Sequence, residues 1–207
     1  MRLAIVCNDK QYSELTAISP QAGLEILRIS EPAVAEGADL YMDLLFNNEG
    51  TRIAQWNKVN PGLLIIGAVE FRVSGLNMPF ILINNWPGFL QRDLWEAAAP
   101  GEGKEKMTGL CDLLNRKLEW VQAEPGLVSA RVISMIINEA FLTVEEGVTD
   151  VSAIDTAMKL GTNYPYGPFE WAEKIGHDKI CSLLELLAAE KPRYRPAASL
   201  SRKANVL

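Results

Sequence analysis

The sequence predicts an α/β fold, with a mostly parallel sheet over residues 1–123 followed by an all-α domain over residues 124–207. The first half alternates short aliphatic runs with polar or helical stretches, a pattern typical of parallel sheets covered by helices. Residues 124–126, Glu-Pro-Gly, form a boundary, and beyond it the apolar residues recur only with helical spacing.

Five strands are expected in the first half, because each run is short, aliphatic and bounded by Gly, Pro, Asn or Asp. They cover residues 3–7, 24–27, 40–46, 63–66 and 80–83. A helix is expected over residues 51–58, because Asn60, Pro61 and Gly62 would end it. Later elements of this half are a helical stripe over 107–114 and a last strand over 118–121.

The second half is expected to contain helices only. Residues 127–144 are apolar nearly all round, which is typical of a helix buried in a core or in a subunit interface. A short helix follows, in which Ser152 and Asp155 resemble an N-cap arrangement and Gly161 is placed as the terminating glycine. Pro168 suits the first turn of the next helix. The remaining segments are an amphipathic helix over 181–189 and a mildly basic tail over 191–207.

Composition excludes several classes of function. The 207 residues are 48% hydrophobic and 22% charged, as in an ordinary globular protein. The net charge of −6 argues against a nucleic acid partner, and no apolar run approaches the roughly 20 residues needed to cross a membrane. Residues 1–7 predict a strand rather than a signal peptide. The three separated cysteines, Cys7, Cys111 and Cys181, predict reduced thiols of a cytoplasmic protein and no metal site.

An ordered series of short motifs runs with almost no gaps from residue 125 to residue 187. The motifs occupy residues 125–128, 138–140, 145–148, 154–155, 157–161, 163–165, 167–170 and 175–178. This series closely resembles the C-terminal domain of 3-hydroxyacyl-CoA dehydrogenases. The resemblance implies a helical domain that pairs two subunits in a homodimer and forms one wall of an acyl-CoA site. It makes Asn163, Tyr164 and Tyr166 candidate substrate-binding residues.

The first half is similar to the Rossmann domain of the same family, in a reduced form. Residues 37–48 resemble the family's Ala-Asp-Leu strand, and residues 60–66 resemble the strand after it. The stretch between the first strand and Ala38 is much shorter than in the family. At least one strand–helix unit is therefore expected to be missing. The resemblance also implies that the cofactor of this domain is NAD.

The expected cofactor turn departs from the family pattern. A dinucleotide fold needs glycines after its first strand, because the backbone must approach the pyrophosphate closely. Cys7, Asp9 and Tyr12 stand where the three glycines would fall, and Lys10 restores charge but not shape. Arg28 occupies the place of the acidic residue that grips the ribose. These replacements argue against NAD bound in the usual mode.

The expected catalytic positions also depart from the family pattern. The family uses a histidine base and a glutamate twelve residues later, which correspond here to Asn84 and to Glu96, in a predicted strand-to-helix region. Asparagine cannot take up the hydroxyl proton at neutral pH. The family's substrate-hydroxyl segment aligns with residues 69–72, and a family asparagine aligns with Ala130. His177, the sole histidine, is expected on the surface at a helix start.

Three functions follow from these observations. The first is a degenerate 3-hydroxyacyl-CoA dehydrogenase homologue of fatty-acid metabolism, which retains acyl-CoA binding with weak or no dehydrogenation. The second is an active NAD-dependent oxidoreductase with a remodelled site that uses Glu96, Asn84 and His177. The third is a non-catalytic subunit that dimerises with an active paralogue.

Overall fold

The computed structural model describes residues 1–99 and 101–205. The chain divides into two compact units, Met1–Leu127 and Val128–Leu207. We call them the sheet unit and the helical unit. The boundary expected from the sequence, between residues 123 and 124, lies slightly earlier in the chain.

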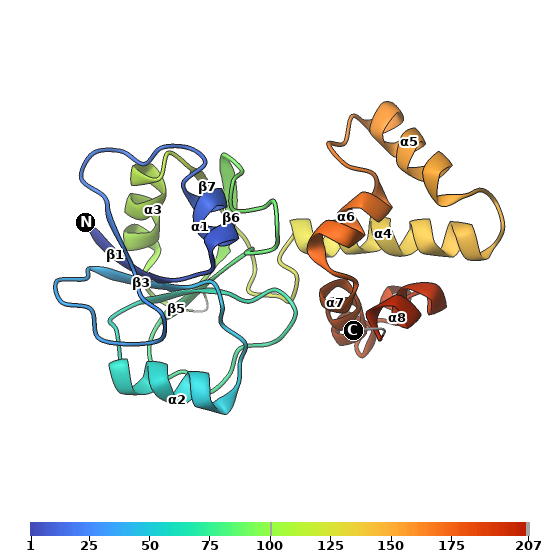
Figure 1. The fold of residues 1–207 in the computed structure, drawn as a ribbon. Coiled ribbons are helices and arrows are strands. Elements are labelled where there is room, and N and C mark those ends of the chain that lie inside the picture. The colour runs from blue at the N-terminus through green and yellow to red at the C-terminus, as the bar shows by residue number, and fades with distance from the viewer. Residues whose placement is uncertain (100, 206–207) are drawn as a thin grey trace. The chain divides into compact units, whose positions relative to one another are not determined.

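The described part of the sheet unit forms a seven-stranded sheet in the order β2-β1-β3-β4-β5-β6-β7 (Figure 1). Strands β1 to β5 run parallel, β6 runs antiparallel to β5, and β7 is parallel to β6. The strands are β1 (Arg2–Val6), β2 (Glu25–Arg28), β3 (Leu40–Asp43), β4 (Leu64–Gly67), β5 (Phe80–Ile83), β6 (Leu94–Ala98) and β7 (Lys117–Trp120). The predicted fold class, a reduced Rossmann-like and mostly parallel sheet followed by an all-α domain, is confirmed.

The sheet is reduced at its outer edge. A doubly wound dinucleotide-binding sheet has the strand order 3-2-1-4-5-6, with two strands outside strand 1. Within the described residues, β2 alone lies outside β1. The opposite edge differs from the prediction, because the residues around Glu96 form strand β6 rather than a strand-to-helix transition. Trp95 and Ala97 bury one face of that strand.

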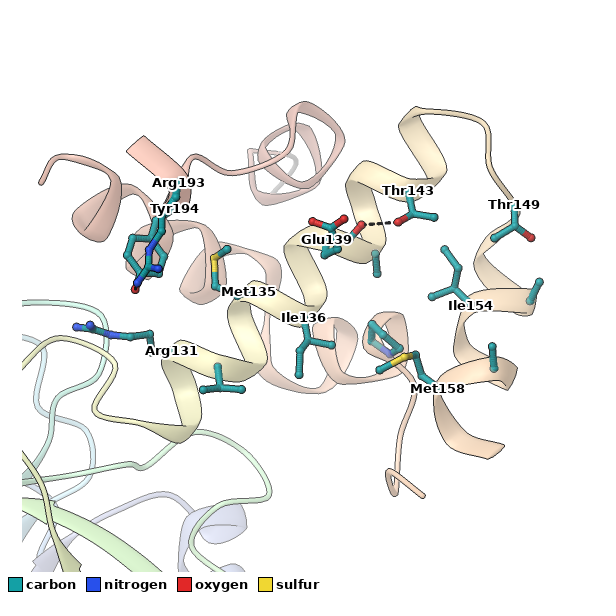
Figure 2. Close-up of a pocket in the computed structure, with 15 residues that line it drawn as sticks. Arg131, Met135, Ile136, Glu139, Thr143, Thr149, Ile154, Met158, Arg193 and Tyr194 are labelled. Carbon is teal, nitrogen blue, oxygen red and sulfur yellow. Dashed lines mark hydrogen bonds between the residues drawn. The ribbon is translucent and has the colours of Figure 1, made fainter. Parts of the chain in front are cut away.

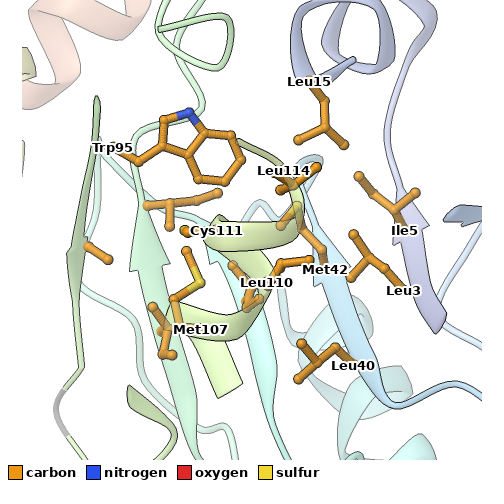
Figure 3. Close-up of a cluster of buried hydrophobic side chains, with 14 of the residues drawn as sticks. Leu3, Ile5, Leu15, Leu40, Met42, Trp95, Met107, Leu110, Cys111 and Leu114 are labelled. Carbon is orange, nitrogen blue, oxygen red and sulfur yellow. The ribbon is translucent and has the colours of Figure 1, made fainter. Parts of the chain in front are cut away.

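Three helices cover the two faces of this sheet. Leu15 of α1 and Cys111 of α3 belong to the apolar cluster on one face (Figure 3), and Trp56 of α2 belongs to the cluster on the other. Burial raises the pKa of the Cys111 thiol to about 12, so this cysteine stays protonated and serves as core. The helices are α1 (Asp9–Leu15), α2 (Gly50–Val59) and α3 (Lys104–Leu113).

A buried carboxylate at the end of β3 joins the sheet to α2. Asp43 is fully buried, and its oxygens accept two hydrogen bonds from Arg52, both of 2.7 Å. They also accept one from the indole nitrogen of Trp56 (2.7 Å) and one from the backbone N–H of Leu45 (2.9 Å). The bond to Leu45 turns the chain, so β3 ends at Asp43 rather than continuing to residue 46 as the sequence predicts.

The helical unit is built around α4, the longest helix in Figure 1. Ile137 and Phe141 bury its inner face. The predicted tail is folded, because buried Asn138 donates to the Arg195 carbonyl (3.0 Å) and accepts from the Ala197 N–H (2.7 Å). The elements are α4 (Ser129–Glu145), α5 (Val151–Thr162), α6 (Pro168–Ile175), α7 (His177–Ala188), the 3₁₀ turn η1 (Pro192–Tyr194) and α8 (Ala198–Ala204).

The caps of α5 differ from those expected. Asp150 rather than Ser152 caps its start, by accepting a hydrogen bond from the third residue along (2.9 Å). The helix continues one residue past Gly161, and Asn163 takes the left-handed conformation with φ 55°. Asparagine tolerates that conformation because its short side chain forms local hydrogen bonds. Pro168 opens α6 as predicted.

Asp155 caps a different helix from the one expected. It lies in the middle of α5, is largely buried, and accepts a hydrogen bond from the backbone N–H of Phe169 (2.9 Å). A methyl group at Gly167 would collide with its carboxylate, so the turn between α5 and α6 approaches Asp155 closely. The carboxylate therefore stabilises the start of α6, where backbone N–H groups would otherwise be unsatisfied.

We predict that Asp43→Ala lowers the free energy of unfolding by roughly 3–5 kcal/mol, because the Arg52 charge would lose its buried partner. Urea denaturation followed by tryptophan fluorescence measures the change. Glu25→Ala, which removes an exposed carboxylate paired with Arg2, is the control and should have a much smaller effect. Equal effects of the two substitutions would contradict the role assigned to Asp43.

Candidate functional site

The residues at the expected glycine positions lie in the turn from β1 into α1. Cys7 follows the strand, and Asp9 and Tyr12 belong to the helix. Asn8 caps that helix: its side-chain oxygen accepts from the Gln11 N–H (2.8 Å), and its own N–H donates to the Gln11 side chain (3.1 Å). This reciprocal capping uses the backbone N–H groups that a phosphate at a helix start would need.

Arg28, at the end of β2, closes over this turn. Its guanidinium donates to Asp9 (2.7 Å) and to the Cys7 carbonyl (3.5 Å), and lies 4.8 Å from the ring centroid of Tyr12. The hydrogen bond to Asp9 raises the pKa of Arg28. The residue at the expected ribose-binding position therefore contacts all three residues that replace the glycines.

The carbonyl of Leu44, directly after β3, accepts two side-chain hydrogen bonds at the carboxyl edge of the sheet. It accepts a hydrogen bond from the side-chain amide of Gln11 (2.8 Å) and another from that of Asn85 (2.8 Å). Gln11 comes from α1 and Asn85 follows β5, so two amides from different elements converge on one oxygen. The ends of β1, β3 and β5 are thereby joined through side chains.

Asn84 and Glu96, the expected catalytic positions, lie next to each other. The Asn84 amide nitrogen is 3.5 Å from a Glu96 oxygen, and the Asn84 oxygen accepts from the Trp86 N–H (3.0 Å). Asn84 is only 7% exposed. Burial lowers the pKa of nearby Arg92, and the Glu96 charge partly opposes that shift. The structure thus pairs a carboxylate with an amide where the family resemblance implies a carboxylate and an imidazole.

The loop after β5 is held by two carboxylates that the sequence did not single out for this role. Glu14 of α1 accepts from the Gly88 N–H with both oxygens (2.8 and 2.9 Å). Glu70, within the segment aligned with the family's substrate-hydroxyl residues, accepts from the indole of Trp86 (2.6 Å). These contacts, like those of Gln11 and Asn85, join residues far apart in sequence, so no local motif could have revealed them.

The three candidate substrate-binding residues lie between α5 and α6 in the helical unit. Asn163 ends α5, and Tyr164 is 37% exposed. The ring of Tyr166 packs 4.9 Å from that of Trp171 and 5.0 Å from the ammonium of Lys174. Tyr166 therefore stabilises the turn, whereas Tyr164 presents its ring to solvent.

His177 begins α7 as expected, but its side chain is only 11% exposed rather than on the surface. Its ring packs edge-on against Phe141 at 5.9 Å, and Nε2 lies 3.6 Å from the Glu173 carboxylate. Burial is the main cause that lowers the His177 pKa; Glu173 opposes the shift and Lys203 adds to it. The histidine is therefore enclosed by its own helical unit and held largely neutral.

An apolar groove of about 930 Å³ lies between α4 and α5 (Figure 2). Val132, in its lining, is 51% exposed, and Leu160 of α5 is 83% exposed. Arg193 and Tyr194 border the groove and are joined by a hydrogen bond of 2.7 Å. The apolar side chains of its lining include Met135, Ile136, Ile154 and Met158.

The described ranges 1–99 and 101–205 contain neither a metal-binding cluster nor a membrane-spanning helix. No group of three or more His, Cys, Asp or Glu side chains in them could hold a metal ion. The helices in these ranges include none that is both long and apolar enough to cross a membrane.

Residues 126–206 match the sequence profile of the 3-hydroxyacyl-CoA dehydrogenase C-terminal domain. The chain is 34% identical over 131 residues to 3-hydroxyadipyl-CoA dehydrogenase of Escherichia coli K12, covering 62% of this chain and 28% of that enzyme. It is 45% identical over 80 residues to a probable 3-hydroxybutyryl-CoA dehydrogenase of Bacillus subtilis, covering 38% of this chain and 28% of that protein. The matched segments thus span less than a third of either relative.

A solved structure extends the likeness to the whole fold. The (S)-3-hydroxybutyryl-CoA dehydrogenase of Ralstonia eutropha superposes with a TM-score of 0.74 at 19% identity, over 97% of this chain and 92% of that one. At this identity the likeness concerns the fold alone. The profile match over residues 126–206 confirms the resemblance inferred from the motifs of the helical half.

We predict that His177 makes the protein less stable as the pH falls. Its folded-state pKa lies below the ordinary value of about 6.5, so the unfolded chain binds the proton more readily. Stability is retained above pH 6.5 and falls as the pH drops from there toward the lowered pKa. In His177→Gln, the free energy of unfolding between about pH 7.5 and 5.5 should depend less on pH. An unchanged slope, measured by urea denaturation, would contradict the burial of a neutral imidazole.

Proposed function

We propose that this chain, whose residues 126–206 belong to the 3-hydroxyacyl-CoA dehydrogenase C-terminal domain family, acts in acyl-CoA metabolism as a binding homologue without NAD-dependent dehydrogenation. The observation that carries this proposal is the Asn84–Glu96 pair.

Oxidation of a 3-hydroxyl group requires a base that removes the hydroxyl proton as hydride leaves C3. The base should have a pKa near working pH, which a histidine beside a carboxylate supplies. Asn84 stands beside Glu96 at 3.5 Å, and its neutral amide does not accept a proton at neutral pH. The pairing with the carboxylate is present, but an amide replaces the imidazole whose pKa would lie near working pH.

His177 does not supply the missing base. It is the sole histidine of the sequence, and its ring is packed against Phe141 and beside Glu173 within the helical unit. A general base must come within hydrogen-bonding reach of the proton that it removes. An imidazole enclosed by its own helices does not meet that requirement.

Retained acyl-CoA binding is proposed for the helical unit. Support comes from the family match over residues 126–206 and from relatives named for 3-hydroxyadipyl-CoA and 3-hydroxybutyryl-CoA. In the turn between α5 and α6, Asn163, Tyr164 and Tyr166 are the candidate contacts. Because Tyr166 packs against Trp171, that turn is preorganised, and exposed Tyr164 offers an aromatic ring to a ligand.

The groove between α4 and α5 is proposed to bind the same helices of a second copy in a homodimer. Val132, which lines the groove, is exposed, and Val151 and Leu160 of α5 are exposed as well. Contiguous apolar surface of this kind marks protein–protein contacts. A twofold interface uses one patch twice, so the exposed α5 of each copy would cover the groove of the other.

A second candidate is a subunit that pairs with a complete dehydrogenase through the same groove. The 131 matched residues are 28% of the E. coli enzyme, which is therefore more than twice as long as this chain. A relative of that length has room for a complete dehydrogenase beside a segment similar to this chain. Co-elution of this chain with a separately expressed complete dehydrogenase would favour this candidate over the homodimer.

We predict that acetoacetyl-CoA binds the protein but is not reduced with NADH. Calorimetry should detect binding of acetoacetyl-CoA to the wild-type protein. The Tyr164→Ala variant should bind acetoacetyl-CoA more weakly, and the wild type should bind coenzyme A alone more weakly than acetoacetyl-CoA. The rate of NADH oxidation should be lower than that of the B. subtilis relative by at least the roughly 10²–10⁴-fold that a general base contributes. A rate within about tenfold of that relative would contradict the proposal.

We predict that Val132→Asp converts the dimer to a monomer, because a carboxylate would be placed in an apolar interface. Light scattering coupled to gel filtration at micromolar concentration measures the mass. Val34→Asp, which makes the same substitution at an exposed valine of the sheet unit, is the control and should remain dimeric. A monomeric wild-type protein would rule out the proposed homodimer.

A further inference from the structure

Dinucleotides bind at the carboxyl edge of a doubly wound sheet, in the crevice where the strand order reverses. In this chain the reversal lies between β1 and β3, because β2 flanks β1 on one side and β3 flanks it on the other. The β1–α1 turn and the residues after β3 would form the walls of that crevice. In this structure, side chains connect the β1–α1 turn directly to the residues after β3.

Gln11 spans the crevice from α1 to the end of β3. Its oxygen accepts from the Asn8 N–H (3.1 Å), while its nitrogen donates to the Leu44 carbonyl (2.8 Å). Both ends of one side chain are thus used to join the two walls. The Gln11 N–H, which could otherwise meet a phosphate, donates to the Asn8 side chain (2.8 Å).

Asn85 fills the adjoining part of the same edge. It donates to the Leu44 carbonyl (2.8 Å) and packs against Gly67 so closely that any Cβ at that position would collide with it. Gly67 ends β4. The absence of a side chain at Gly67 therefore leaves room for Asn85 of the same chain.

Arg28, at the end of β2, lies on the outer side of the crevice. Its guanidinium forms an exposed salt bridge with the Asp9 carboxylate and lies over the Tyr12 ring. An arginine near the end of the second strand can accept a 2′-phosphate only if its donors are available. Here Nη2 of Arg28 donates to Asp9 and to the Cys7 carbonyl, in the turn that would have held the pyrophosphate.

We propose that the dinucleotide crevice of this Rossmann-like unit is occupied by an internal bridge formed by Gln11, Asn8, Leu44 and Asn85, so that the unit binds neither NAD nor NADP and folds without either. The residues present do not fit a dinucleotide. This proposal adds the cofactor to the proposed function, and it rests on that function in taking NAD and NADP as the relevant ligands.

The first test is calorimetric titration of the full chain with NAD, NADH and NADP, without acyl-CoA. No binding is expected up to millimolar ligand, and none of the three should raise the melting temperature. A dissociation constant below about 1 mM for any of them would overturn the inference, because that is the range in which a formed site would be detected.

The second test asks whether the bridge exists in solution. In Gln11→Met, the Asn8 amide should exchange with deuterium roughly fivefold or more faster, as expected for the loss of about one hydrogen bond. Lys10→Met, a substitution at the neighbouring exposed residue, is the matched control and should leave that rate unchanged. Equal rates in the wild type and Gln11→Met would overturn the bridge even if no dinucleotide binds.

The two proposals can fail separately. Dinucleotide binding without turnover would overturn the closed crevice and leave the absence of a base at Asn84 intact. Failure of acetoacetyl-CoA to bind would overturn the proposed acyl-CoA function and leave the closed crevice intact.

Discussion

The sheet unit depends on the buried carboxylate of Asp43. Its oxygens hold Arg52 and Trp56 of α2, so the helix is fixed to the sheet by charge-assisted hydrogen bonds as well as by apolar contact. Its bond to the Leu45 N–H fixes the turn after β3 and therefore the direction of the Leu44 carbonyl between them. That carbonyl receives Gln11 and Asn85, so the arrangement of the carboxyl edge follows from one buried charge.

Much of the fold was predictable because its signals are local. Aliphatic runs bounded by turn residues identified β1 to β5, and Pro168 marked the start of α6. The elements that the sequence did not reveal, or whose ends lie elsewhere than expected, lack such signals. Helix α1 buries only Leu15, so it has no apolar stripe, and the caps at Asp150 and Asn163 compete with nearby residues of equal capping propensity.

The candidate site was predictable only where family spacing applied. The twelve-residue interval identified Asn84 and Glu96, which the structure places in contact. The roles of Gln11 and Glu14 rest on partners 33 and 74 residues away, respectively, and those partners are backbone groups. Because nearly every residue has a backbone carbonyl and N–H, residue type does not reveal which of them bonds to a distant side chain. Contacts of this kind are therefore visible only in the folded structure.

The missing outer strand has a consequence for the behaviour of the protein in concentrated solution. Within the described residues β2 is an edge strand, and edges with unpaired backbone groups invite strands from other molecules to add. β2 has only four residues, and its ends, Glu25 and Arg28, are charged and held by Arg2 and Asp9. A short strand flanked by fixed charges is a poor template for further pairing. The Arg28–Asp9 salt bridge therefore also places fixed charge at the exposed edge of the shortened sheet, a feature that disfavours edge-to-edge pairing.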